Sequence, residues 1–557
     1  MSLAALAPRG AVRPGWSTGP LAALAGTGVL LAGVLMLPIA LPIGAMYWDL
    51  GLYVDAAQRI ERGQVPSRDF FAPVGPLGYY LFAGVAKLFP QAHPLLVAQW
   101  STLLMTAPPM ALVVRDAAAR SPALAWALLL PFLLFTVLPF NTREFYPYPG
   151  SDAFGIYNRQ AAQLLYVLTA ALLFVRDRIA LGMTVAVAMS GLFGLKITGF
   201  LAGGLVCAWG LVAKRVPFRV AAAAAGAFVV AASMLEALSG IVSAYLVDIA
   251  TLAGKNGGGL AGRFLQSASV WFGVLAPAGA LVLVMAWVDR RRPSLDHPAA
   301  WLAVAAFAGL AYETQNTGSQ GLIHLWPPLL LAGGWALQRG RALPVTGLVL
   351  ALAAATALPS AVAITERAAR TWTGAARNVA LNHRELGPIG RVNARPEVAR
   401  HANVLKRHYA AHRPAYDALS AAGEMPSFIF YSDAATQLLH LEIAADAARA
   451  VRALERERGV RFETVWSLNF TNLLAAALDR DAPRHVAIGA DPGRAVPAPG
   501  GPEAAAVRNT DLVVRPVCPL TPANRDLLAL FEGALADHSR VRLTPCMEAW
   551  VHPRFGP

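Results

Sequence analysis

Two short polar stretches near the N-terminus contain residues that could move a proton or hold a phosphate. Asp49 follows a long apolar run, and Arg68-Asp69 precedes an aromatic segment broken by Gly and Pro. A carboxylate can act as a general base, and an arginine can bind phosphate. We expect Asp49 to be the catalytic base, Asp69 to be a second catalytic group or a metal ligand, and Arg68 to bind substrate. The simpler alternative is that Asp49 caps a helix over about 50–62 and that Asp69 pairs with Arg68 in a turn.

Other polar residues lie at the ends of apolar runs further along the chain. The ones we assign to substrate binding are Tyr157, Asn158, Arg159, Lys196, Glu313, Gln315, Asn316 and His324. Arg159 and Lys196 are expected to contact a phosphate, because a cation beside apolar segments is costly unless it has a partner. Glu313 and His324 flank a turn and could bind sugar hydroxyls. Anchoring at the membrane surface and helix capping remain the alternatives for this group.

The elements that must position these residues are transmembrane helices. The chain has 557 residues, is 56% hydrophobic and only 14% charged, and has a mean hydropathy of +0.48. Such a composition indicates a polytopic membrane protein. The net charge of +14 lies largely in short clusters between apolar runs, where it sets membrane topology, so we expect no nucleic-acid partner.

We predict about eleven spans within residues 1–365. The apolar runs lie at about 21–43, 94–114, 121–140, 160–175, 179–194, 197–213, 218–240, 269–288, 299–312, 321–337 and 344–364. Counting alternately from a cytoplasmic N-terminus places the arginine-rich turns inside and the candidate site residues outside. The segment 50–62 is amphipathic and should lie flat in the membrane interface, and the short run 75–89 should lie there too.

Residues 366–557 have a different composition, rich in Arg, Glu and Asp. Strand-like runs at 427–431, 464–468, 485–489, 511–514 and 541–544 alternate with helical stretches near 434–458, 471–480 and 522–538. Alternation of this kind predicts a soluble, periplasmic α/β domain with a largely parallel sheet. Asn469 and Asn472 follow a predicted strand, where ligand binding or ordinary turn chemistry could explain them. Cys518 and Cys546, the only cysteines in this part, are expected to form a disulfide if they are adjacent.

The first outer loop resembles that of a known family. The stretch Gly63 to Tyr80, G-x-V-P-x-R-D-F-F-x-P-x-G-P-L-x-Y-Y, together with Asp49 at the exit of the first span, resembles the first periplasmic loop of the GT-C superfamily of polyprenyl-phosphate-sugar-dependent glycosyltransferases. Its bacterial mannosyltransferase-like and aminoarabinose-transferase-like branches are the most similar. Many members carry Asp-Glu where this chain has Asp49-Leu50, so the source of any second carboxylate is left open.

The resemblance implies a GT-C fold and an activity. The chain would be a multi-pass glycosyltransferase of the bacterial inner membrane, transferring a hexose or pentose with inversion. Its partners would be a polyprenyl-phosphate-linked sugar donor, membrane lipid, and a glycan, lipid or protein acceptor. No cofactor is assigned, and a divalent metal ion is left open. The alternatives are a transporter or flippase of lipid-linked sugars and a non-catalytic assembly protein for envelope polysaccharides.

Overall fold

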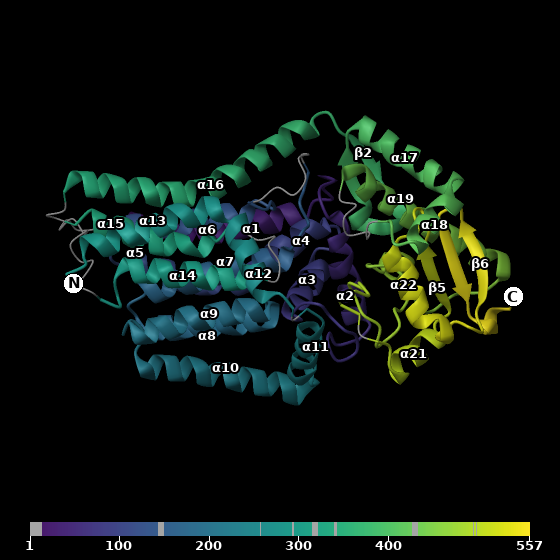
Figure 1. Ribbon diagram of the computed structural model, residues 1–557, viewed down its shortest axis with the longest axis horizontal. Helices are drawn as coiled ribbons and strands as arrows, with labels where there is room; N and C mark the ends of the chain where they lie inside the picture. Colours follow the sequence, from purple (N-terminus) through teal and green to yellow (C-terminus); the bar gives the residue numbers. More distant parts are fainter. Residues whose placement is uncertain are drawn as a thin grey trace.

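A helical bundle and a C-terminal part with two small sheets lie end to end along the longest axis of the molecule (Figure 1). The structure is a computed structural model, which describes residues 14–142, 150–256, 258–291, 294–314, 321–338, 342–425, 433–493, 495–496 and 498–556. It confirms the expected class, a polytopic helical protein with a C-terminal α/β part.

Each of the eleven expected apolar runs contains helix. These helices are α1 (Pro14–Leu35), α4 (Pro94–Trp100) with α5 (Leu103–Ala118), α6 (Pro122–Val137), α7 (Ile156–Phe174), α8 (Arg178–Leu195), α9 (Ile197–Val212), α10 (Phe218–Ser239), α13 (Phe272–Val288), α14 (Pro298–Glu313), α15 (Trp326–Ala336) and α16 (Leu343–Ala375). Within the described ranges, five helical segments are long and apolar enough to cross a membrane alone. A sixth would be α12 (Leu260–Val270) joined to α13, although the two are bent by 87°.

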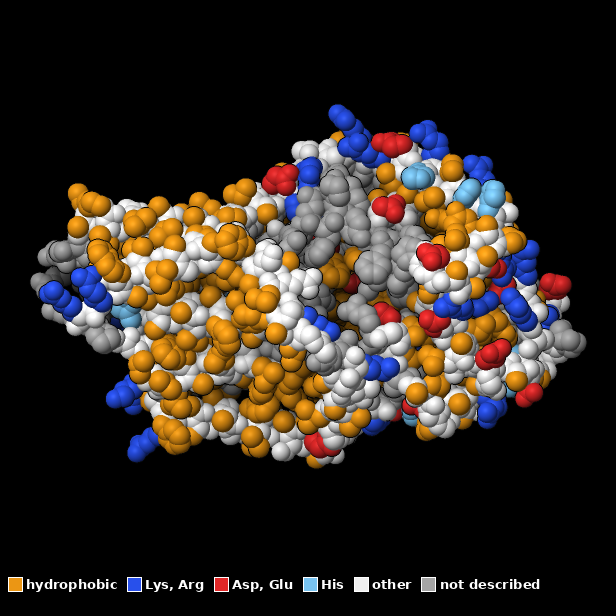
Figure 2. All heavy atoms as spheres, in the orientation of Figure 1, with side chains coloured by type: hydrophobic (Ala, Val, Ile, Leu, Met, Phe, Trp, Pro, Cys, Tyr) orange, Lys and Arg blue, Asp and Glu red, His pale blue; other side chains and the backbone are white. Residues whose placement is uncertain are grey.

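The outer surface of the bundle is hydrophobic, as a lipid-facing surface must be. Figure 2 shows apolar side chains covering the helices of the bundle, with Lys and Arg at the end away from the C-terminal part and again at the junction and on the C-terminal part itself. Large apolar side chains such as Leu343, 86% exposed, point outward. In contrast, α7 is buried along nearly its whole length and forms the centre of the bundle. Soluble proteins do not expose an apolar surface of this extent to water, so the bundle is a membrane domain.

The amphipathic segment after Asp49 was expected to turn its polar face to the membrane interface, but protein covers that face instead. It forms α2 (Leu50–Glu61), which packs against α3 (Leu77–Leu88) and is buried on its polar face too. Arg59 is fully buried, pairs with Asp55 at 2.8 Å, and donates to the Pro483 carbonyl at 2.7 Å. The C-terminal part therefore covers the face that the sequence assigns to lipid headgroups.

A three-stranded sheet joins the first outer loop to the C-terminal part. The strand β1 (Leu41–Pro42) pairs in parallel with β3 (Arg391–Ala394), and β2 (Val379–Asn382) pairs antiparallel with β3 on its other side. Residues from the exit of the first span thus share a sheet with residues after the last span. The site loops and the C-terminal part are consequently one packed unit.

The second sheet corrects the expectation of a largely parallel arrangement. It contains β4 (Val465–Ser467), β5 (Leu512–Pro516), β7 (Met547–Val551) and β6 (Ser539–Thr544) in that order, and only β4 and β5 are parallel. The predicted strand at 427–431 lies outside the described residues. Residues 485–489 form no strand, because the His485 and Ile488 amides donate to carbonyls of the first loop, Asp69 and Phe71.

Helices of the C-terminal part pack around these sheets. They are α17 (Pro396–Ala411), α18 (Arg413–Ala421), α19 (Ala434–Arg458), α20 (Leu473–Leu478), α21 (Gly501–Arg508) and α22 (Pro522–Phe531). The Asp433 side chain caps α19 by accepting from the Thr436 amide, and Gly459 ends it in the left-handed conformation. Cys518 and Cys546 are joined by a disulfide, which confirms the expected pairing.

Candidate active site

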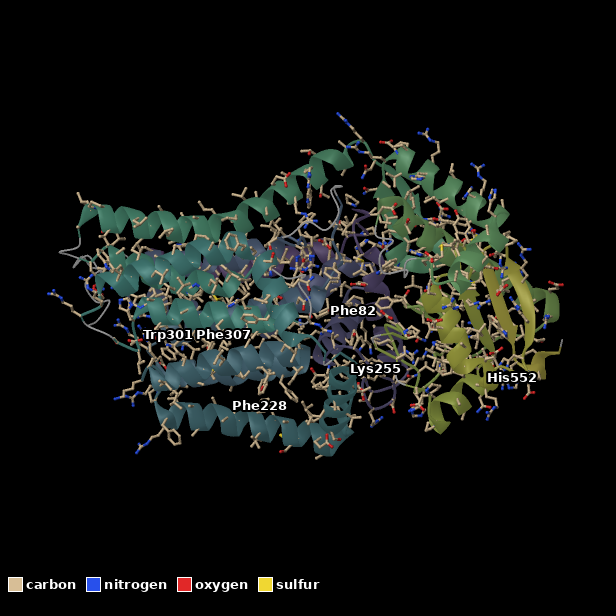
Figure 3. All side chains as sticks on the ribbon, in the orientation of Figure 1. Phe82, Phe228, Lys255, Trp301, Phe307 and His552 are labelled. Atoms are coloured by element: carbon tan, nitrogen blue, oxygen red, sulfur yellow. A yellow bond between two sulfur atoms is a disulfide. The ribbon has the colours of Figure 1, made fainter. Side chains whose placement is uncertain are left out.

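A cavity of about 640 Å³ lies where the outer end of the bundle meets the C-terminal part. Three walls come from the bundle side: the first loop with α2, the ends of α7 and α9, and the pair α11 (Ile241–Asn256) and α12. The fourth wall comes from the C-terminal part, through Phe470, Gly489, Asp491 and Ala495. Figure 3 places Lys255, in the last turn of α11, at this junction. The cavity is large enough for a sugar and its leaving group.

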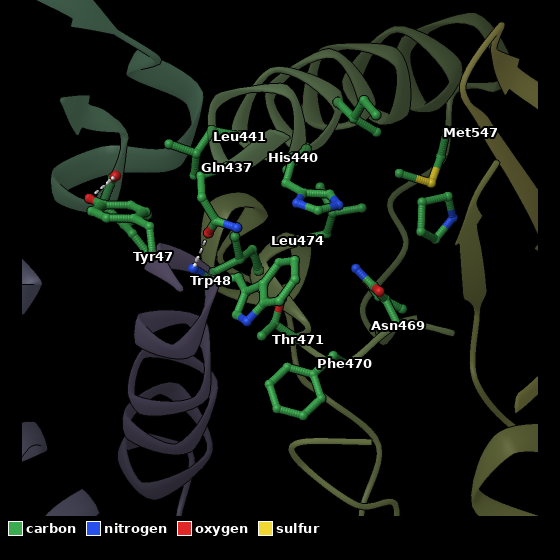
Figure 4. A pocket seen from close by; sticks show the side chains of 16 residues that line it. Tyr47, Trp48, Gln437, His440, Leu441, Asn469, Phe470, Thr471, Leu474 and Met547 are labelled. Atoms are coloured by element: carbon green, nitrogen blue, oxygen red, sulfur yellow. Dashed lines mark hydrogen bonds between the residues drawn. The ribbon is translucent and has the colours of Figure 1, made fainter. Parts of the chain in front are cut away.

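Asp49 lines this cavity from a turn that is held on both sides. It ends the short 3-10 helix η2 (Tyr47–Asp49) and occupies the N-cap position of α2, yet its side chain makes no capping hydrogen bond. The Tyr47 hydroxyl donates to the Ile389 carbonyl at 2.8 Å, and the Trp48 amide donates to Gln437 Oε1 at 3.1 Å (Figure 4). The capping alternative therefore does not account for the Asp49 carboxylate.

Lys196 enters the cavity from the junction of α8 and α9. Its Nζ donates to Asn158 Oδ1 at 2.6 Å and lies 4.5 Å from the centroid of the Tyr312 ring and 5.6 Å from that of Tyr157. Tyr157 also lines the cavity. The structure thus brings together three residues that the sequence assigned to substrate binding. Aromatic rings attract an ammonium electrostatically, so the two rings favour the charged form of this buried side chain.

Glu313 supports this cluster from behind. It is fully buried at the end of α14, accepts a hydrogen bond from Trp271 Nε1 at 3.3 Å, and interacts electrostatically with Lys196. It does not line the cavity. Its position suits it to orient the lysine, and a direct contact with sugar hydroxyls would need rearrangement. Gln315 and Asn316 lie outside the described residues.

Arg159 and His324 are buried away from the cavity wall. Arg159 Nη2 donates to the Asp152 carbonyl at 3.1 Å, and His324 Nε2 lies 3.0 Å from the Ala305 carbonyl. Neither is among the residues that line the cavity. Arg159 Nε and Nη1 have no hydrogen-bond partner among the described residues, so the guanidinium is held in place by packing and by one hydrogen bond.

Asp69 and Arg68 join the first loop to its neighbours and do not line the cavity. Arg68 pairs with Asp69 at 2.9 Å and donates to the Ser239 carbonyl, and Arg484 lies 3.4 Å from Asp69. Burial acts to raise the pKa of Asp69, but hydrogen bonds from Arg68 and the Val65 amide, together with both arginine charges, hold that pKa below its usual value. A carboxylate with two cationic neighbours is a poor metal ligand. Within the described residues, no three His, Cys, Asp or Glu side chains are grouped to hold a metal ion.

The cavity residues that were not singled out from the sequence include Asp248, Arg263, Phe470 and Asp491. Asp248 is the only acidic residue of α11, and its Oδ2 accepts from the Ala72 amide at 3.2 Å. Burial raises the pKa of Asp248 to about 7. Arg263 on α12 has no side-chain partner among the described residues. A lone charge in an apolar helix was the only signal available for Asp248.

Comparison with known proteins gives structural likenesses alone. No protein-family model and no curated protein matches the chain. ArnT from Cupriavidus metallidurans, a GT-C glycosyltransferase solved with undecaprenyl phosphate, matches with a TM-score of 0.44 and 14% identity over 97% of this chain and 99% of its own. The apo structure of the same ArnT matches with a TM-score of 0.38 and 15% identity, over 96% of this chain and 98% of its own. A third match is the oligosaccharyltransferase AglB from Archaeoglobus fulgidus, in complex with an inhibitory peptide and a dolichol-phosphate. Its TM-score is 0.30 and its identity 10%, over 94% of this chain and 72% of its own. At these TM-scores, no residue here takes a role from a neighbour.

Proposed function

We propose that this chain is an integral membrane glycosyltransferase that moves one sugar, with inversion, from a polyprenyl-phosphate donor to an acceptor. The observation that carries the proposal is that Asp49 and Lys196 line one cavity at the outer end of a lipid-facing bundle. A lipid-linked phosphate presents its reacting bond at that depth of the membrane. The first-loop motif that resembles GT-C enzymes supplies the same wall of the cavity.

The reaction would need one base and one or more cations. An acceptor hydroxyl attacks the anomeric carbon from the face opposite the phosphate, and its proton passes to the Asp49 carboxylate. The bond between the anomeric carbon and the phosphate oxygen breaks, and the phosphate keeps the electron pair. Lys196 and Arg263 would stabilise the negative charge that develops there. A single displacement of this kind inverts the configuration at the anomeric carbon.

A transporter of lipid-linked sugars is the main alternative. It predicts charged groups deep within several spans. In this structure Arg159 lies in the first turns of α7, Lys196 between α8 and α9, and Glu313 at the end of α14. Arg367 of α16 is also buried and pairs with Asp152, which precedes α7. A site at one end of the bundle suits chemistry at a surface better than passage through the membrane.

We further propose that the N-terminus is cytoplasmic and the C-terminal part periplasmic, in a bacterial inner membrane. The Cys518–Cys546 disulfide supports this side, because disulfides persist in oxidising compartments. A fusion of alkaline phosphatase to the C-terminus should be active, and a fusion in the α5–α6 turn should be inactive. Activity with the reverse pattern would overturn this topology.

The base is tested by Asp49→Asn in proteoliposomes, with release of polyprenyl phosphate from a panel of lipid-linked hexoses and pentoses as the readout. Loss of a general base should lower turnover about 10²-fold or more while insertion and folding stay intact. Asp537→Asn, at an exposed position of the C-terminal part, is the matched control. Turnover near the wild-type level in Asp49→Asn would remove Asp49 from the mechanism.

A further inference from the structure

A second, smaller pocket of about 60 Å³ opens beside the main cavity, and Phe470 lines both. Its walls come from η2, α19, the loop after β4, and the ends of β5 and β7 (Figure 4). Trp48 lines the small pocket, while its neighbour Asp49 lines the main cavity. The neighbouring side chains of Trp48 and Asp49 therefore line two different cavities, which share Phe470 as a wall.

The lining of the small pocket carries no fixed charge. None of its 16 described lining residues is Asp, Glu, Lys or Arg. Burial lowers the pKa of His440 to about 4, so this ring is neutral at physiological pH. The main cavity differs sharply, because Asp49, Lys196, Asp248 and Arg263 all face it. An ionic ligand would lose its hydration in the small pocket without gaining a counter-charge.

Rings and amides provide the contacts that the small pocket offers. The Trp48 and His440 rings lie with their centroids 5.1 Å apart, and His440 Nδ1 has no hydrogen-bond partner among the described residues. Asn469 Oδ1 accepts from Asn524 Nδ2 at 3.1 Å, and the amide nitrogen of Asn469 points into the space between His440 and Trp48 (Figure 4). A purely apolar ligand would leave these polar atoms unpaired.

We propose that this pocket binds a neutral sugar ring of the acceptor, with Trp48 and Phe470 against its faces and Asn469 and His440 on its hydroxyl groups. This assignment rests on the proposed glycosyl transfer and narrows the acceptor to a glycan. The pocket admits one edge of a ring, since its volume suits only a few water-sized groups. The rest of the ring then lies past Phe470 in the main cavity, where a hydroxyl can reach Asp49.

The test uses the full chain in nanodiscs and saturation-transfer NMR with four probes: methyl α-mannopyranoside, methyl α-glucopyranoside, methyl α-glucopyranosiduronate with its free carboxylate, and cyclohexanol. The two neutral glycosides should receive saturation on their ring protons, and the charged glycoside and cyclohexanol should receive at least fivefold less. Phe470→Ala and Asn469→Ala should each lower the neutral-glycoside signal at least fivefold. The matched controls are Phe218→Ala, 74% exposed on α10, and Asn403→Ala, exposed on α17, which should leave it unchanged.

Two results would overturn the pocket assignment: a signal in either pocket variant equal to that of the wild type, or equal signals from the charged and neutral glycosides. Donor consumption, measured in parallel, separates this failure from that of the proposed function. If the wild type consumes donor while the pocket variants bind glycoside normally, only the pocket assignment is contradicted. If the wild type binds neutral glycosides through Phe470 and Asn469 but consumes no donor, the proposed transfer reaction is contradicted and the pocket assignment is not. Asn469→Ala removes fewer atoms than Phe470→Ala, so loss of signal in both variants shows that the loss does not come from misfolding of one of them.

Discussion

The two sides of the main cavity are built from different chemistry. The bundle side presents Asp49, Lys196, Asp248 and Arg263, each of which lies in a helix or at a helix end. The side from the C-terminal part presents Phe470, Gly489, Asp491 and Ala495, and behind Phe470 an uncharged pocket. Four charged residues thus line the bundle side against one, Asp491, on the other side, while the pocket behind Phe470 adds rings and an amide without any charge. The division suggests that reaction and recognition depend on different parts of the chain.

Among variants that test the roles of the two sides of the cavity, we expect Lys196→Ala to have the largest effect on catalysis. Removing the ammonium removes charge stabilisation of the departing phosphate, which should lower kcat/KM for the lipid-linked donor about 10²-fold or more. Steady-state kinetics with varied donor would measure it. Lys87→Ala, exposed in the last turn of α3, is the control. If donor kinetics match those of the control, Lys196 does not stabilise the departing phosphate, and its buried contacts with Asn158 and the two tyrosine rings are structural only.

An intermediate effect is expected from Gln437→Ala, in the C-terminal part. The change leaves the buried Trp48 amide without its acceptor, which costs about 1–3 kcal/mol and loosens the turn that carries Asp49. We expect kcat to fall about tenfold with the donor KM unchanged. Gln437→Glu keeps an acceptor oxygen at this position and should restore most of kcat. Equal losses in both variants would show that the C-terminal part does not position Asp49 through this contact.

The smallest effect concerns Asp248 and pH. Burial raises its pKa to about 7, so the carboxyl is neutral below that pH and becomes ionised above it. An anionic Asp248 repels a donor phosphate in a cavity that also contains Asp49, Lys196, Arg263 and Tyr245. The donor KM should therefore rise about threefold between pH 6 and 8. In Asp248→Asn this rise should vanish, and a rise of the same size in that variant would assign it to another group.

Much of the fold follows from hydropathy and capping. The eleven apolar runs each contain helix, and α19 begins and ends as expected because Asp433 caps it and Gly459 stops it. The sequence could not show that α2 is covered on both sides, since an amphipathic pattern is the same whether the polar face meets water or another polar surface. Much of its partner surface is the backbone carbonyls of 480, 482 and 483, which carry no side-chain signal, although Arg62 also pairs with Asp479 and Asp481.

The candidate site was predicted in part, for a related reason. Asp49, Tyr157, Asn158 and Lys196 lie together because each sits at the end of an apolar run, and such ends meet at one membrane face. Phe470 and Asp491 come from loops far along the chain, and only tertiary packing brings them to the cavity. At Gly489 that packing is close: a Cβ would lie 3.1 Å from Pro73, and φ is +62°.

The hydrogen bond between Trp48 and Gln437 joins residues 389 positions apart. At typical synthesis rates, the ribosome needs roughly 20–80 s to make that length of chain. During this interval the turn at Asp49 has already been synthesised, but α19, which carries Gln437, has not. The cavity is thus among the last features to be completed, and a chaperone that shields residues 41–73 until translation ends would raise the yield of active protein.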